Sequence, residues 1–220
     1  MLVKLNSTEL RIVKMGVISN GTTLLDAGAL DSGVATGAMT LIKTLTASGS
    51  STLSFVDGAS NVVLDGTYKE YIFKLINIHS VDNSANMVFN LSVDSGSNYN
   101  VTKTSSSFAA WHKEDDSGTS LAYNTGNDLA QSTSGQRILF GGLDNANDGN
   151  GCATLHLFDP SSTTFVKHFI CNAVKNSYHP YAWNTFVAGY GNTTSAVDAI
   201  QFSLDSGNIE TGTIKMYGIK

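Results

Sequence analysis

Apolar and polar residues alternate in several short runs of this sequence, and turn residues follow each run. Met87, Phe89, Leu91 and Val93 fall at every second position, and the same period of two recurs in residues 200–205 and 214–217. Asp-Ser-Gly follows two of these runs, at residues 94–96 and 205–207. A period of two with one polar face is typical of a half-buried antiparallel strand, and Asp, Ser and Gly favour turns. The alternation therefore predicts an all-β chain.

The rest of the sequence favours the same fold class. Residues 71–78 are apolar on nearly both faces, which predicts a central strand. Ser, Thr, Asn and Gly make up 88 of the 220 residues and only 14% are charged, a composition poor in helix formers. No stretch of ten residues has a convincing 3.6-residue period. Many strands with long loops predict a jelly-roll-like antiparallel β-sandwich over residues 39–220.

Residues 1–38 differ from this pattern. They hold two short strand-like runs, Leu2–Leu5 and Leu10–Ile18, and then a segment rich in Gly, Ala and Asp at residues 26–38. Neither part has enough apolar residues for a core of its own. We therefore expect an extended N-terminal arm that attaches the chain to something outside itself. The alternative is that these residues add edge strands to the main domain.

One hairpin can be given a register. Residues 152–158 and 165–171 flank a six-residue loop, which predicts that Cys152 faces Cys171. Because disulfides between adjacent strands are uncommon and a cytosolic product stays reduced, we expect two thiols. In this register His156 and His168 point to opposite faces. The core face then holds Ala153, Leu155, Leu157, Val166, His168 and Ile170.

Charge and hydropathy exclude several classes of partner. Lys and Arg total 13 against 18 Asp and Glu, a net charge of −5, and only Arg11 and Arg137 are arginines. Such a chain is a poor nucleic-acid binder. No apolar run approaches the ~20 residues needed to span a bilayer, so we expect no membrane insertion. The N-terminus shows no signal-peptide pattern, which predicts synthesis and assembly in the cytosol.

Motifs for catalysis, cofactors and metals are weak or missing. The sequence has no phosphate-binding glycine loop and no Gly-x-Ser-x-Gly. Residues 144–150 resemble a calcium loop, but Ala146 and Leu155 stand where oxygen ligands are needed, so a solvated turn is favoured. The five histidines lack zinc spacing. We therefore expect no catalytic residues, no cofactor and no metal site.

An aromatic group is the main candidate for a contact site. Tyr178, His179, Tyr181 and Trp183 surround Pro180, and Trp111 lies elsewhere in the sequence. Tyr and Trp rings stack on sugars and also anchor protein interfaces. We expect these residues in a loop. They either pack against one another or contact a glycan or a neighbouring subunit.

Three segments carry a resemblance to a known group of proteins. They are Gly-Thr-Ile-Lys-Met-Tyr-Gly-Ile at residues 212–219, the run at residues 68–79 and the run at residues 192–202. Together they resemble structural proteins of tailed bacteriophages, notably marine and cyanobacterial phages. The resemblance covers residues 40–220 and assigns no catalytic or ligand residues. It implies a non-enzymatic virion protein, a capsid decoration or tail fibre-type appendage subunit, with other virion proteins as partners.

Such subunits work through shape and multiplicity. A short arm can add a strand to a neighbour's sheet edge, and closed symmetry multiplies weak contacts, so we expect a homo-oligomer with a trimer favoured. Two alternatives stay open. One is a carbohydrate-binding module that recognises a host surface glycan through the aromatic group. The other is a glycan-cleaving enzyme that uses Glu114 or Asp116.

Overall fold

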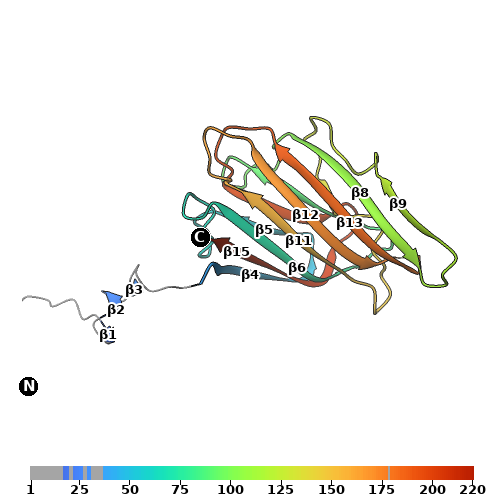
Figure 1. Cartoon of the computed structure of the whole chain (residues 1–220), viewed down its shortest axis with the longest axis horizontal. Helices are drawn as coiled ribbons and strands as arrows, with labels where there is room; N and C mark the ends of the chain where they lie inside the picture. Colours follow the sequence, from blue (N-terminus) through green and yellow to red (C-terminus); the bar gives the residue numbers. More distant parts are fainter. Residues whose placement is uncertain (1–16, 20–21, 27–28, 31–36, 178) are drawn as a thin grey trace, which may run out of the picture. The chain divides into compact units, whose positions relative to one another are not determined.

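The computed structural model describes residues 17–19, 22–26, 29–30, 37–177 and 179–220. In these residues the chain forms strands and loops without a helix (Figure 1). The strands are β1 (Val17–Ser19), β2 (Thr22–Asp26), β3 (Ala29–Leu30), β4 (Met39–Ser50), β5 (Thr52–Val56), β6 (Glu70–Ser80), β7 (Met87–Ser92), β8 (Lys103–Lys113), β9 (Thr119–Tyr123), β10 (Gln136–Leu139), β11 (Gly151–Phe158), β12 (Lys167–Asn176), β13 (Tyr181–Gly191), β14 (Ala199–Leu204) and β15 (Ile209–Ile219).

The chain divides into two compact units, Met1–Gly37 and Ala38–Lys220. In the first unit β1, β2 and β3 form a small antiparallel sheet, with Ile18 opposite Thr23 and Leu25 opposite Leu30. Among the described residues these strands pair only with one another. The expected run at residues 2–5 lies outside the described residues. The attaching role of this segment stays a prediction.

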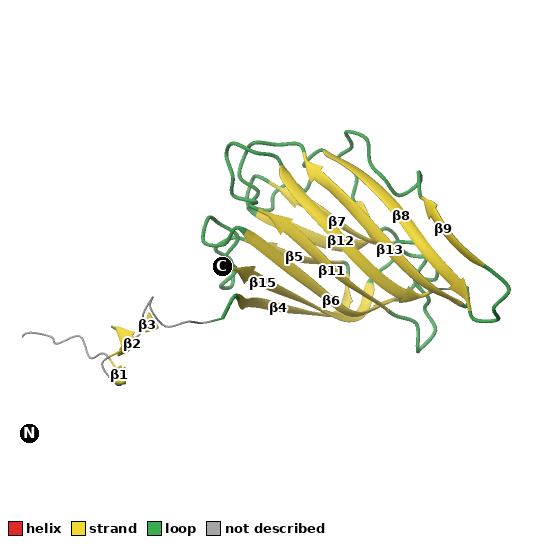
Figure 2. Ribbon diagram, viewed as in Figure 1, coloured by secondary structure: helices red, strands yellow, loops and turns green. Residues whose placement is uncertain are grey.

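The second unit is a sandwich of two antiparallel sheets (Figure 2). The smaller sheet has the order β10-β7-β14-β5, and the larger has the order β4-β15-β6-β11-β12-β13-β8-β9. This arrangement confirms the predicted all-β antiparallel sandwich. The jelly-roll connectivity stays a prediction.

The core lies between the inner faces of the two sheets. Phe55, Phe73, Phe89 and Phe202 are fully buried, and the ring of Phe202 lies 5.5–6.4 Å from the other three. Edge and tilted contacts of this kind stabilise aromatic pairs beyond their burial. The predicted core positions of β7, β14 and β15 are confirmed. They are Met87, Phe89, Leu91, Ile200, Phe202, Leu204, Ile214 and Met216.

Two strand predictions can be compared with the structure in detail. Val93 was expected inside, but it is 38% exposed because β7 ends at Ser92, whose hydroxyl accepts the amide protons of Asp94 and Gly96. The central position of residues 71–78 is confirmed, since β6 lies between β15 and β11. Its apolar outer face is left uncovered, with Ile76 38% exposed.

The predicted register of the hairpin from β11 to β12 is wrong. Cys152 lies opposite Val174 and Leu155 lies opposite Cys171. The turn is longer than the predicted six-residue loop: the last pair of the ladder is Leu157 opposite Phe169, where the prediction has Leu157 opposite Val166, so the register shifts by three residues. Such a shift turns every side chain of one strand to the other face.

The shifted register changes which side chains reach the core. Ala153, Leu155 and Leu157 are buried as predicted, but Val166 lies in the loop and His168 and Ile170 are exposed on the outer face. His156 pairs with Ile170 and therefore shares the outer face with His168, contrary to the prediction. Both cysteines are free thiols, as expected.

Three lysines occupy inner positions at or near strand ends. Lys103, Lys167 and Lys175 are at most 3% exposed. The ammonium group of Lys167 donates to three loop carbonyl oxygens at 2.6–3.2 Å, and that of Lys175 donates to two. Buried charges need such partners. The lysines thereby tie loops to the ends of the large sheet.

Candidate functional site

The aromatic cluster is made by the neighbouring strands β8 and β13. Trp111 lies opposite Trp183 in the ladder, and its ring is 5.0 Å from that of Tyr181 and 6.2 Å from that of Trp183. The exposed His179 ring lies 5.8 Å from Tyr181. Tyr178 lies outside the described residues. The structure thus brings four of the five predicted residues together.

The predicted loop position of Tyr181 and Trp183 is wrong, because β13 begins at Tyr181. Their side chains are half-buried on the inner face of the large sheet, where Trp183 packs against the core. A Cβ at Gly141 would lie 2.8 Å from the Trp183 ring, so this contact requires glycine.

Cations and neighbouring rings occupy much of the aromatic surface of this cluster. The three rings of Trp111, Tyr181 and Trp183 are within 17° of parallel. The ammonium group of Lys113 lies 5.7 Å from the Tyr181 centroid, and that of Lys175 lies 5.4 Å from the Trp183 centroid. Rings used in this way stabilise one another and the cations. A role in contacting a glycan or a subunit stays a prediction.

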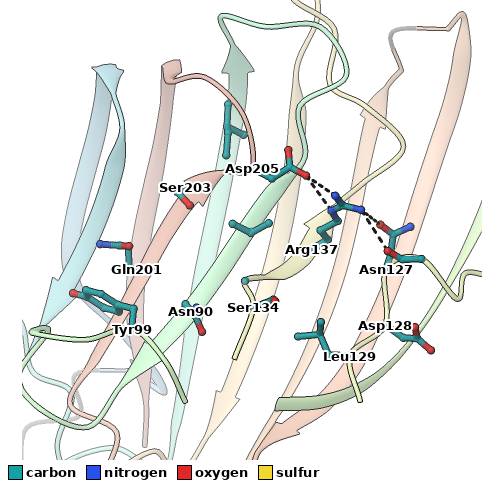
Figure 3. A pocket seen from close by; sticks show the side chains of 14 residues that line it. Asn90, Tyr99, Asn127, Asp128, Leu129, Ser134, Arg137, Gln201, Ser203 and Asp205 are labelled. Carbon is teal, nitrogen blue, oxygen red and sulfur yellow. Dashed lines mark hydrogen bonds and ion pairs between the residues drawn. The ribbon is translucent and has the colours of Figure 1, made fainter. Parts of the chain in front are cut away.

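A polar groove crosses the outer face of the small sheet (Figure 3). Its volume is about 520 Å³, within the usual range of small-molecule sites. The floor comes from β7, β10 and β14, and the walls come from the loops around residues 99 and 126–135. The groove is lined by Val88, Asn90, Tyr99, Gly126, Asn127, Asp128, Leu129, Ser134, Gly135, Arg137, Gln201, Ser203, Leu204 and Asp205.

A hydrogen-bond network fixes one end of the polar groove. Arg137 donates to one carboxylate oxygen of Asp205 from Nε at 3.0 Å and from Nη2 at 2.9 Å. The same oxygen accepts a proton from the Asn86 amide at 2.9 Å, and Arg137 Nη1 donates to Asn127 Oδ1 at 3.2 Å. Charge-assisted bonds of this kind are short and directional. The Arg137 side chain is therefore held in place from two sides.

Sequence reasoning did not find the polar groove. Its floor residues Asn90, Gln201 and Ser203 are the polar halves of the alternating runs whose apolar halves were recognised as core. The signal was therefore present, but Arg137 and the wall loops come from distant parts of the chain. Only the pairing of β7 with β10 and β14 brings these residues together.

An exposed apolar patch covers part of the outer face of the large sheet. Phe186 lies opposite Phe108, which lies opposite Tyr123, and the two phenylalanine rings stack at 4.9 Å and 12°. Members of this apolar patch are 38–72% exposed. They are Phe108, Leu121, Tyr123, Ile170, Val174 and Phe186.

No known protein family, curated protein or solved structure matches this chain.

The acidic residues considered as calcium ligands or as catalytic groups lie in turns. The Asp144 carboxylate accepts the Ala146 amide proton at 3.1 Å, and Asp116 lies 3.1 Å from His112 in the open turn between β8 and β9. Groups of three or more His, Cys, Asp or Glu side chains suited to a metal do not occur in the described part of the chain. Nor does that part contain a helix able to span a membrane.

Proposed function

We propose that this chain is a non-enzymatic structural subunit of the virion of a tailed bacteriophage, either a capsid decoration protein or an appendage subunit of the tail-fibre type. In this proposal the N-terminal segment, residues 1–38, attaches the chain to other virion proteins. The sandwich associates with further copies of itself. The observation that supports self-association is the exposed apolar patch on the large sheet.

Exposed apolar side chains that gather on one face of a sheet mark interaction surfaces, whereas scattered ones do not. The apolar patch lies on β8, β9, β12 and β13. The outward positions of β8, β12 and β13 carry no Lys, Arg, Asp or Glu. The whole chain, by contrast, has a net charge of −5. Two copies that meet through this face place no like charges against each other. A second copy of this chain is therefore the occupant that the patch favours.

Closed rotational symmetry in which the patches converge on the symmetry axis would bury the apolar patch of each copy, and we propose a trimer as the favoured state. The separate N-terminal unit supports attachment through a segment distinct from the sandwich. The resemblance of residues 40–220 to phage structural proteins supports a virion location. Multiple attached copies would make weak contacts strong in sum.

Attachment is tested by adding the full chain and residues 39–220 to virions that lack the protein. Occupancy is measured by quantitative mass spectrometry of washed particles, after circular dichroism has shown that both proteins are folded. The full chain should occupy the particles and the truncated chain should not. Equal occupancy by the truncated chain would contradict attachment through residues 1–38.

Self-association is tested with Phe108→Glu, which places a charge within the apolar patch. Phe165→Glu is the matched control, since Phe165 is 70% exposed in the loop before β12 and lies outside the patch. Light scattering should give a multiple of the 23.3 kDa chain mass for the parent and the control, and the single-chain mass for Phe108→Glu. A monomeric parent at every concentration would contradict this part of the proposal.

A further inference from the structure

We infer that the polar groove on the small sheet is a binding site for a neutral oligosaccharide. This inference goes beyond the proposed structural role and does not depend on it, because the groove floor belongs to the small sheet and no residue of the apolar patch lines the groove. Four features of the groove support it: free hydrogen-bonding groups, apolar surface beside them, the balance of charge, and rigidity.

The groove presents donors and acceptors that the protein leaves unused. Gln201 donates one amide proton to Ser54 at 3.0 Å, but its carbonyl oxygen has no partner in the described part of the chain. The hydroxyl groups of Ser203 and Tyr99 likewise have no hydrogen-bond partner in the described part of the chain. Amides and hydroxyls both donate and accept. They therefore match sugar hydroxyls, which also do both.

Apolar surface lies beside these polar groups. Tyr99, Val88 and Leu129 all line the groove, and Figure 3 shows Tyr99 and Gln201 at one end with Asn127 and Arg137 at the other. A sugar ring has C–H groups on its faces and hydroxyls around its edge. Small-molecule sites combine apolar walls with a few placed polar groups in the same way. An aromatic ring such as that of Tyr99 supplies a flat surface for a sugar face.

The charges in the groove exclude acidic ligands. Asp205 neutralises Arg137 through their ion pair, and Asp128 adds one further negative charge. One oxygen of Asp128 accepts the Tyr123 hydroxyl proton at 2.7 Å, which leaves the other for a ligand. A phosphate or a uronic acid would meet a net negative site. A neutral saccharide meets no such repulsion and can donate to the free carboxylate oxygen.

The groove is also held in shape before any ligand arrives. Arg137 is fixed by Asp205 and Asn127, and the Asn90 side-chain amide donates to Thr133 O at 3.1 Å, which ties the floor to a wall loop. Groups that are already ordered lose little conformational entropy on binding. This rigidity favours recognition of one sugar stereochemistry over another.

The test begins with the full chain on an array of neutral and uronic-acid oligosaccharides. Titration calorimetry then follows with the neutral oligosaccharide retained most strongly. Gln201→Ala and Tyr99→Ala remove groove groups and should each weaken binding about tenfold. Asn172→Ala is the matched control, because it loses a side-chain amide bond, to Asn184 Oδ1 at 3.4 Å, on the outer face of the large sheet and away from the groove. It should bind as the parent does.

Two further measurements make the result decisive. Thermal unfolding of each variant shows that it is folded, and the side-chain amide NMR signals of Gln201 and Asn127 should shift during the titration of the parent. The inference is overturned if the array retains no neutral oligosaccharide, or if the acidic forms bind more tightly. It is also overturned if both groove variants bind as well as the parent, which would place the site elsewhere, for example at the aromatic cluster.

Discussion

The ammonium group of Lys175 donates to the carbonyl oxygens of Gly141 and Gly142, at 3.1 and 2.6 Å, while it lies 5.4 Å from the centroid of the Trp183 ring. Burial of this group lowers its pKa from 10.5 to about 7, and Asp144 only partly offsets the shift. Burial also lowers the pKa of Lys103 to about 8. Both lysines therefore release a proton in the folded state at a pH where the unfolded chain still holds it.

This difference predicts how stability depends on pH. Between about pH 7 and 9 the unfolded chain binds more protons at Lys175 and Lys103 than the folded chain does, so the free energy of unfolding rises with pH. Thermal unfolding monitored by circular dichroism should show a rising midpoint over this range. Lys175→Met removes one of the two groups and should flatten the rise. A midpoint that falls steadily from pH 7 to 9 in the parent contradicts the prediction.

Phe202 is the aromatic centre of the core, and its loss should be severe. Phe202→Ala leaves a cavity among Phe55, Phe73 and Phe89 and should destabilise the fold by about 3–5 kcal/mol, measured by urea unfolding. Phe165→Ala is the control, since this side chain is 70% exposed. Its effect should stay within about 0.5 kcal/mol. Equal effects of the two changes would mean that the core does not lie between the sheets.

Gly189 allows β13 to approach β8 and β12 closely. A Cβ at this position would lie 2.4 Å from the carbonyl oxygen of Thr104 and 2.8 Å from the Phe169 ring. Because backbone must move to relieve that overlap, Gly189→Ala should destabilise the protein by about 3 kcal/mol. At Gly126 an added Cβ meets open space, so Gly126→Ala should change stability by about 0.5 kcal/mol or less. A well-tolerated alanine at position 189 would argue against this packing.

The two thiols should differ strongly in reactivity. Cys171 is 1% exposed and burial raises the pKa of its thiol, whereas Cys152 is half-exposed on the outer face of the large sheet. The thiolate is the reactive form. A thiol reagent should therefore label one cysteine per chain in the folded protein and two after unfolding. Cys152→Ser should abolish the labelling in the folded state, and a variant that still reacts would place Cys171 at the surface.

The sequence predicted the strands better than it predicted their pairing. Period two identified the core faces of β7, β14 and β15, since burial alone decides that pattern. The register of β11 and β12 failed because it was predicted from a six-residue loop, whereas the turn is longer and places Lys167 inside, where loop carbonyls satisfy its charge. A buried lysine is invisible to an argument from hydropathy.

For the candidate sites too, local features were predicted from the sequence and long-range pairing was not. The aromatic cluster was found because Tyr181 and Trp183 are near each other in the sequence, although their strand position was missed. The polar groove joins Asn90, Arg137 and Gln201, which only the pairing of β7 with β10 and β14 brings together. Without that pairing the three residues are separate polar positions of different segments.

The chain enters the sandwich at β4, an edge strand that pairs with β15. The pairing begins beside the bond from the Lys220 amide to the Ala38 carbonyl oxygen. A mechanical load applied to the segment before residue 38 would therefore reach the ladder between β4 and β15 before it reaches the rest of the sandwich. Under such a load, that pair of strands would be the first part of the sandwich to be strained.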